Sequence, residues 1–237
     1  MANRTPLVLY TNRNCPWAHR AHIVLAELGI PYEEHHIDYS VPRSPQYLQI
    51  NPRGQVPTLV CGDQIIRESA IAAQFLADSV PSTHLTLRTG DIAGALMRAR
   101  IAFFVETYFS KANKYYYPAI EATTDEEADS LGALFAAAVS SEIEPLLHDA
   151  APFFGGSEKL TMAEVLTASF ILRIFTLPTA ENPPLPLTMI LGLNSKAPRF
   201  YSWAQAVLTH PSVNGIYSLN GCAAEMQERR AKARGLL

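Results

Sequence analysis

The first eighty residues alternate between short apolar runs and segments whose apolar positions recur at helical spacing. The run Leu7-Val8-Leu9-Tyr10 is typical of a strand, whereas Val24, Leu25 and Leu28 share one face of a helix. Extended along the region, the pattern predicts a strand at 7–10, a helix at about 15–28, a strand at 32–37, a short helix at 45–50, a hairpin over 57–61 and 64–67, and a helix from 69. This βαβ, helix, ββα order predicts a small mixed sheet with flanking helices, and the crossover rule makes the first two strands parallel.

Strand patterns largely disappear in the rest of the chain. Residues 81–90 are polar and contain proline, so we expect a linker there between an α/β domain at 1–80 and an all-helical domain at 91–237. Helical spacing predicts helices at 91–108, at 125–147, after a capping box at 161–164, and at 198–208. The acidic residues 125–127 complement the dipole of the second of these helices, and we expect them to need no partner.

Composition narrows the class of protein. With 237 residues, 48% apolar and 17% charged, the chain is expected to be globular with a large core. A net charge of -3 gives no general attraction to nucleic acid or to an anionic membrane, so neither is expected as a partner. No apolar run approaches the ~20 residues that span a bilayer, and the N-terminus has no signal-peptide pattern. Cys15, Cys61 and Cys222 match neither a disulfide scaffold nor a zinc site, so we expect a cytoplasmic protein without a metal.

Cys15 is the strongest candidate for chemistry. It precedes Pro16, which fits the first position of the helix predicted at 15–28. The free N–H groups and positive dipole end of that helix then point at the Cys15 sulfur, which favours thiolate over thiol. The position three residues after Cys15 is Ala18, so the chain has no C-x-x-C pair here and the site is of the monothiol type.

Four segments carry a family resemblance: Cys15-Pro16-Trp17-Ala18-His19-Arg20, Asn51-Pro52-Arg53-Gly54-Gln55-Val56-Pro57-Thr58-Leu59, Glu68-Ser69-Ala70-Ile71 and Thr161-Met162-Ala163-Glu164. In this order and spacing they resemble the cytosolic glutathione transferases, particularly the cysteine-containing, omega-like class. The resemblance implies a thioredoxin-like first domain, glutathione as co-substrate, a helical second domain carrying the acceptor-substrate site, and a homodimer. Two positions depart from the pattern: Glu164 stands where aspartate is usual, and Trp17 where omega members more often have phenylalanine.

The resemblance also implies which residues bind glutathione. A cis bond between Val56 and Pro57 would let the cysteinyl unit pair with the Val56 backbone as a short added strand; the alternative is an ordinary trans proline that starts a strand. Ser69, with the helix start that follows it, would bind the γ-glutamyl carboxylate, and Glu68 its ammonium group; the alternative is a simple serine cap. Arg43 is the candidate for the glycyl carboxylate, unless it is a solvated surface charge.

These features predict a glutathione-dependent thiol transferase or reductase that cleaves glutathione mixed disulfides or thioethers through a Cys15 mixed-disulfide intermediate. A thiol is a weak hydrogen-bond donor, so Cys15 suits disulfide exchange better than it suits holding a glutathione thiolate. The expected acceptors are small hydrophobic or aromatic electrophiles or glutathionylated substrates. Candidate contacts for them are Trp17, Phe104, Tyr108 and Tyr115, several of which are equally suited to a core. A conjugating transferase or isomerase of a specialised pathway, and a non-catalytic transferase-like binding or regulatory module, remain as alternatives.

Overall fold

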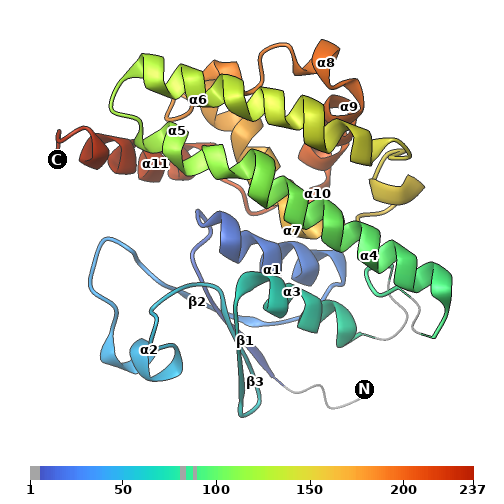
Figure 1. Cartoon of the computed structure of the whole chain (residues 1–237). Coiled ribbons are helices and arrows are strands. Elements are labelled where there is room, and N and C mark those ends of the chain that lie inside the picture. The colour runs from blue at the N-terminus through green and yellow to red at the C-terminus, as the bar shows by residue number, and fades with distance from the viewer. Residues whose placement is uncertain (1–5, 81–83, 88–89) are drawn as a thin grey trace. The chain divides into compact units, whose positions relative to one another are not determined.

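The computed structural model describes residues 6–80, 84–87 and 90–237. The chain divides into two compact units, Met1–Thr86 and Leu87–Leu237 (Figure 1). Parts of the expected linker, residues 81–83 and 88–89, lie outside the described residues.

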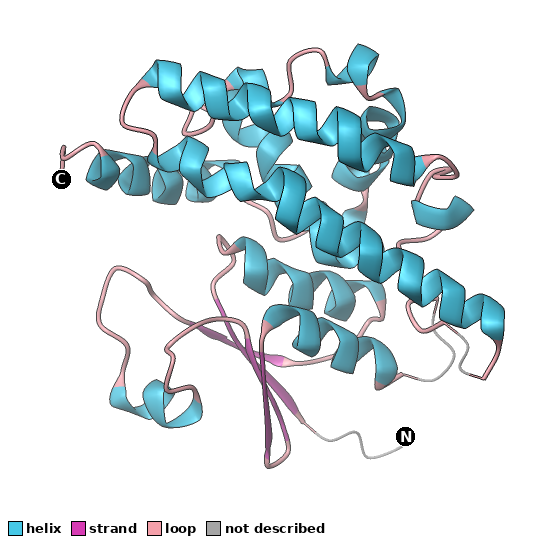
Figure 2. Ribbon diagram, viewed as in Figure 1, coloured by secondary structure: helices cyan, strands magenta, loops and turns pink. Residues whose placement is uncertain are grey.

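The N-terminal unit has the predicted thioredoxin-like order. Its elements are β1 (Leu7–Thr11), α1 (Pro16–Glu27), β2 (Glu33–His36), α2 (Pro45–Ile50), β3 (Thr58–Cys61), β4 (Gln64–Arg67) and α3 (Ser69–Asp78). The four strands form one sheet in the order β2-β1-β3-β4 (Figure 2). β1 and β2 are parallel, as the crossover rule predicts, and the other two pairs are antiparallel. The mixed four-stranded sheet with helices is therefore confirmed.

A buried histidine links α1 to β1. The Nε2 atom of His22 lies 2.8 Å from Oγ1 of Thr11, and its Nδ1 atom lies 3.1 Å from the hydroxyl of Tyr32. His22 is 2% exposed, and this burial lowers its pKa from 6.5 to about 4. The ring is therefore neutral at physiological pH and ties α1 to the sheet at the level of the β1 C-terminus.

The C-terminal unit is helical, as predicted. Its main helices are α4 (Ile92–Thr107), α5 (Tyr116–Glu121), α6 (Asp125–Ala138), α7 (Met162–Thr176), α8 (Leu193–Lys196), α9 (Pro198–Thr209), α10 (Pro211–Asn214) and α11 (Leu219–Ala233). α7 is almost wholly buried and packs against α4 and α9.

The capping box at the start of α7 is present, and it reaches further than the sequence indicates. Glu164 is fully buried and accepts hydrogen bonds from the N–H of Thr161 at 2.7 Å and from the N–H of Phe154 at 2.8 Å. It also accepts one from Nε1 of Trp203, on α9, at 2.6 Å. The longer glutamate side chain thus caps α7 and joins it to two further segments of the same core.

The helix predicted at 125–147 is interrupted. α6 ends at Ala138 and is followed by a π-helical turn at Val139–Ile143 and a 3-10 turn at Glu144–Leu147. Pro145 explains the final change, because proline supplies no N–H for a regular helix.

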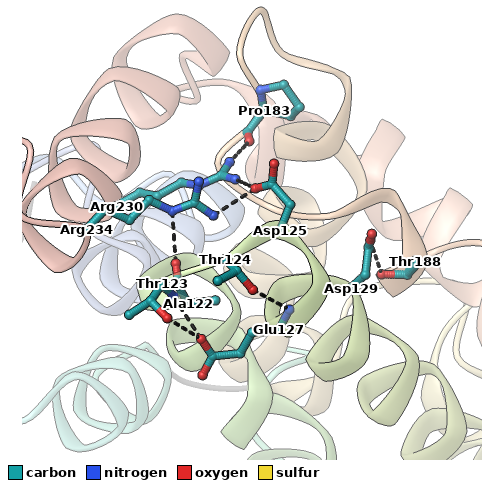
Figure 3. A network of polar contacts seen from close by, with 10 residues as sticks. All are labelled: Ala122, Thr123, Thr124, Asp125, Glu127, Asp129, Pro183, Thr188, Arg230 and Arg234. Carbon is teal, nitrogen blue, oxygen red and sulfur yellow. Dashed lines mark hydrogen bonds and ion pairs between the residues drawn. The ribbon is translucent and has the colours of Figure 1, made fainter.

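The acidic start of α6 has partners, contrary to the expectation that it needs none. Asp125 forms ion pairs with Arg230 and Arg234 at the end of α11, and hydrogen bonding from Arg234 lowers its pKa (Figure 3). Arg234 also donates from Nε to the Ala122 carbonyl at 3.0 Å, and Arg230 donates to the Pro183 carbonyl at 2.6 Å. Arg230 of α11 and Arg234, which directly follows this helix, therefore hold the start of α6 and the proline-rich segment in place.

Two helical stretches, Asp125–Leu147 and Met162–Thr179, are long and apolar enough to cross a membrane by length and composition alone. The expectation that no stretch comes close to this limit was therefore too strict. The second stretch is a core helix with 83% of its apolar window buried, and the first begins with the ion-paired Asp125.

Candidate functional site

A cavity of about 500 Å³ opens in the N-terminal unit where three loops meet. These loops precede α1, β3 and α3, and each carries one of the segments singled out in the sequence. The residues that line the cavity are Cys15, Trp17, Arg20, Tyr39, Arg43, Asn51, Arg53, Gly54, Gln55, Val56, Pro57, Arg67, Glu68, Ser69 and Ala70. The cavity therefore brings Cys15 together with all five residues expected to bind glutathione.

Cys15 is the N-cap residue of α1, directly before Pro16 at the first helical position. Its N–H donates to the Asn12 carbonyl at 3.0 Å, and its own carbonyl accepts from the N–H of His19 at 3.1 Å. Its side chain makes no capping hydrogen bond, and the residue is 8% exposed in a cluster with Val56. The sulfur is thus held on the cavity wall at the positive end of a 12-residue helix.

The loop before β3 is held by a network of buried polar groups. The Val56–Pro57 bond is cis, as the resemblance predicts. Nδ2 of Asn51 donates to the Gln55 carbonyl and to Oγ1 of Thr58, each at 2.9 Å. The hydroxyl of Tyr47 also donates to the Gln55 carbonyl. Within the described part of the chain, the N–H and C=O of Val56 have no hydrogen-bond partner, so they remain available on the cavity wall.

The junction between β4 and α3 has an unusual backbone. Glu68 adopts φ 69° and ψ 122°, a region that residues other than glycine rarely occupy, and it caps α3 without a side-chain hydrogen bond. The first N–H groups of α3 therefore lack a side-chain cap at the cavity. The Glu68 carboxylate accepts from Nη1 of Arg53 at 2.6 Å, and Oγ of Ser69 accepts from Nη1 of Arg20 at 2.9 Å.

Arg43 lies at the cavity but is strongly tied to its own loop. Its guanidinium donates to the carbonyls of Gly54 at 3.0 Å, Asp38 at 2.8 Å and Val41 at 3.1 Å. It also stacks on the ring of Tyr39, with 4.6 Å between Cζ and the ring centroid. A β-carbon at Gly54 would lie 3.0 Å from Cγ of Arg43, so the close approach of this arginine favours glycine at a position whose φ is +61°.

The four acceptor candidates fall into different environments. Trp17 lines the cavity, and Tyr115 is half-buried in the C-terminal unit beneath the Lys114 ammonium group. Phe104 and Tyr108 are fully buried. Phe104 packs against Phe154 and Trp203, with ring centroids 5.0 and 5.6 Å away. These two residues therefore pack in the core of this structure, and their contact with an acceptor stays a prediction.

Four polar residues of the cavity have no role predicted from the sequence: Arg20, Asn51, Arg53 and Arg67. Arg20 is the last residue of the segment that begins with Cys15, and its spacing of three from Trp17 places both side chains on one face of the helix. Arg67 donates to the Ile50 carbonyl, 17 residues away, which no local pattern reveals, whereas Asn51 contacts the Gln55 carbonyl within its own loop. In the described residues, no group of three or more His, Cys, Asp or Glu side chains is arranged to hold a metal ion.

Comparison with known proteins agrees with this geometry. The family model of the glutathione S-transferase N-terminal domain matches residues 14–79. A probable glutathione transferase of Aplysia californica is 30% identical over 102 residues, which are 43% of this chain and 100% of that protein. Glutathione S-transferase omega-2 of Mus musculus is 37% identical over 79 residues, 32% of this chain and 31% of that protein. A stringent starvation protein A homolog of Haemophilus ducreyi is 35% identical over 78 residues, 33% of this chain and 36% of that protein.

Solved structures match over much more of the chain. Glutathione transferase Omega 3C from Trametes versicolor has a TM-score of 0.71 at 23% identity, covering 90% of this chain and 89% of its own. Rice GST1, solved in complex with glutathione, has a TM-score of 0.79 at 22% identity, and the match covers 98% of this chain and 100% of the rice chain. At these identities the structures establish the fold.

The chain belongs to the glutathione transferase superfamily. This conclusion rests on the matching N-terminal domain and on the Aplysia californica protein, which the chain covers completely. The alignments with the first five curated relatives span 36% to 52% of their length.

Proposed function

We propose that this protein is a glutathione-dependent thiol transferase that reduces glutathione mixed disulfides through Cys15. The observation that carries the proposal is the single cavity lined by Cys15, the unpaired backbone of Val56 and the start of α3 at Ser69. The sequence similarity to an omega-class transferase supports the same reading.

In this proposal each part of glutathione has a partner on the cavity wall. The cysteinyl unit pairs with the Val56 N–H and C=O in the manner of an added strand. The γ-glutamyl carboxylate binds the Ser69 hydroxyl and the uncapped N–H groups of α3, and the γ-glutamyl ammonium binds Glu68. Arg43 offers its remaining donors to the glycyl carboxylate. Glu68 is already paired with Arg53, so binding exchanges that exposed ion pair for one with the ligand.

The reaction is a pair of thiol–disulfide exchanges. The Cys15 thiolate attacks the glutathionyl sulfur of a mixed disulfide, the S–S bond to the substrate breaks, and the substrate leaves as a thiolate that takes a proton from water. A second glutathione thiolate then attacks the glutathionyl sulfur held on Cys15. Glutathione disulfide is released and the Cys15 thiolate is regenerated. The substrate sulfur is thereby reduced and the one incoming glutathione is oxidised, since the other half of the released disulfide is the glutathionyl group that the mixed disulfide supplied.

The position of Cys15 supports exchange over conjugation. A transferase that conjugates glutathione needs a donor to its thiolate, and a thiol is a weak one. Cys15 instead stands as the N-cap residue of α1 on the cavity wall, where its sulfur can attack a bound disulfide. A second cysteine is missing at the position of Ala18, so external glutathione must resolve the intermediate.

Turnover of a glutathione mixed disulfide with cysteamine tests the proposal. Cys15→Ser is expected to lose at least about 100-fold in kcat/KM, because a hydroxyl does not form the mixed-disulfide intermediate. Cys61→Ser provides the control: Cys61 lies in β3 outside the lining of the cavity, and its loss should leave turnover unchanged. Equal activity of the wild-type protein and Cys15→Ser would refute the mechanism.

Two other readings of the same fold have their own tests. A conjugating transferase would convert chloronitrobenzene-type acceptors while leaving mixed disulfides intact. A regulatory module is favoured by the similarity to proteins named stringent starvation protein A homologs, and it predicts no measurable glutathione affinity by calorimetry. In all three readings we propose a cytoplasmic protein.

A further inference from the structure

We propose that Arg20 is a positioning residue: it fixes the Ser69 hydroxyl as a hydrogen-bond donor aimed at the ligand carboxylate, and Trp17 holds Arg20 in place for this task. The inference rests on the proposed glutathione site, and it adds two residues from α1 to the recognition carried out by α3. It also gives Trp17 a role other than acceptor contact.

The direction of the hydrogen bond between Arg20 and Ser69 is unambiguous. Nη1 of Arg20 lies 2.9 Å from Oγ of Ser69, and a guanidinium has donors but no acceptor. Ser69 must therefore accept, and its own hydroxyl hydrogen has to point elsewhere. No described residue accepts that hydrogen, although Ser69 is only 8% exposed and lines the cavity. A nearly buried donor without a protein partner at a helix start is suited to an anionic oxygen of a ligand.

Arg20 is itself closely held. The residue is 4% exposed, and its guanidinium carbon lies 4.6 Å from the centroid of the Trp17 ring. Trp17 and Arg20 are three residues apart on α1, so the stacking is set by the helix and not by a mobile loop. The contact between Arg20 and Ser69 joins α1 to α3 across 49 residues of sequence.

This arrangement explains why an arginine is needed. A planar guanidinium can stack on an indole ring and donate along its edge at the same time, whereas a lysine ammonium group cannot do both with one fixed geometry. A serine without such a donor would rotate its hydroxyl freely and present a lone pair to the ligand carboxylate part of the time. The guanidinium removes this unproductive orientation and polarises the hydroxyl toward the ligand.

A double-mutant cycle on the full chain tests the inference. The measured quantity is the affinity for S-methylglutathione, which binds without exchange, by calorimetry. Arg20→Met and Ser69→Ala are each expected to weaken binding about tenfold, the usual loss for a hydrogen bond to a charged group. Because Arg20 acts through the serine, adding Arg20→Met to Ser69→Ala should weaken binding less than about twofold further.

Additive losses in the double variant would overturn the inference, because they would mean that Arg20 acts independently of Ser69. Arg20→Lys is expected to recover part of the affinity lost in Arg20→Met, and it remains measurable if the methionine variant does not fold. Arg13→Met removes an exposed arginine that pairs with Glu34 and is not among the cavity residues, so it should bind like the wild-type protein.

Kinetics separate this role from a purely structural one. Arg20→Met should raise KM for glutathione much more than it lowers kcat for disulfide exchange, because the thiol chemistry at Cys15 does not involve Ser69. A fall in kcat with unchanged KM would contradict the assignment. If the wild-type protein does not bind S-methylglutathione, the proposed function itself fails; if it binds and the losses add, only the role of Arg20 fails.

Discussion

At the scale of single residues, the site depends on donors and acceptors that the protein leaves unused. The Val56 backbone, the Ser69 hydroxyl and the first N–H groups of α3 have no full set of partners among the described residues. In the loop beside them, Asn51 and Tyr47 hydrogen-bond the Gln55 carbonyl, and both lie within hydrogen-bond distance of the Thr58 hydroxyl. Such a pattern is expected where a ligand completes the hydrogen bonding.

Tyr47 offers a test of how much this surrounding network matters. Its hydroxyl contacts the Gln55 carbonyl and lies 3.0 Å from Oγ1 of Thr58. Tyr47→Phe is expected to lower the free energy of unfolding by about 1 kcal/mol and to raise KM for glutathione a few-fold, because the loop carrying Val56 loses one anchor.

Tyr10→Phe is the matched control for this substitution. The Tyr10 ring lies 5.3 Å from that of Tyr47, but its hydroxyl has no hydrogen-bond partner among the described residues. Its loss should leave KM unchanged. A similar rise of KM in both variants would show that ring packing, and not the Tyr47 hydroxyl, orders the loop.

The sequence revealed those residues whose role is local. Cys15 before Pro16, the Val56–Pro57 pair and Glu68 before Ser69 could be found because each belongs to a short motif at an element boundary. The contact of Arg20 with Ser69 could not be predicted in this way, since the two residues are 49 positions apart. Phe104 and Tyr108 are fully buried here, although an aromatic residue on an amphipathic helix has the same sequence pattern whether it faces a pocket or a core.

At the scale of elements, polar groups buried between helices and strands fix how they pack. His22 joins α1 to β1, and Glu164 joins the start of α7 to α9. The boundaries of the N-terminal elements followed closely from hydrophobic spacing and from proline positions. The pairing of Asp125 with Arg230 and Arg234 depends on contacts between residues more than 100 positions apart, which no local pattern reveals.

His22 makes stability depend on pH. Its pKa is about 4 in the folded protein, mainly because of burial, with Glu34 and Arg13 as the nearby charges, against 6.5 for an exposed histidine. Between these values the unfolded chain binds more protons than the folded one, so stability falls as the pH drops below 6.5. The loss from this group amounts to about 3 kcal/mol once the pH is below 4, as an upper estimate.

Urea unfolding at pH 7.5 and at pH 4.5 measures this effect. His22→Gln is expected to be less stable at pH 7.5 but to lose less on acidification than the wild-type protein. The exposed His148 provides the control, because His148→Gln should keep the full acid dependence. If His22→Gln lost as much stability between pH 7.5 and pH 4.5 as the wild-type protein, the acid dependence would have to come from other titratable groups.

At the scale of the whole molecule, we propose a homodimer, for which α4 offers an apolar surface. Ile92, Leu96 and Phe103 are 75%, 59% and 62% exposed, and their spacing places them on one face of α4. A cluster of exposed large apolar side chains is a common sign of an interface. The family resemblance predicts the same association, whereas hydrophobic spacing alone did not distinguish this face from a core face.

Leu96→Glu tests the dimer by sedimentation. A charge at the centre of this stripe is expected to convert the dimer to monomers at micromolar concentration, because burying an unpaired carboxylate costs several kcal/mol. Leu191→Glu is the control. This leucine is 64% exposed, but it belongs to the segment just before α8 and not to α4, so its substitution should leave the dimer intact. A Leu96→Glu protein that sediments as a dimer would contradict the assignment of this face.

The central claim is that Cys15 forms a mixed disulfide with glutathione during turnover. Intact-mass spectrometry after brief incubation with a glutathione mixed disulfide, followed by peptide mapping, measures it directly. The account predicts one glutathionyl group per chain, located on Cys15 and removed by excess glutathione. An unmodified Cys15, or modification confined to Cys61 or Cys222, would contradict it.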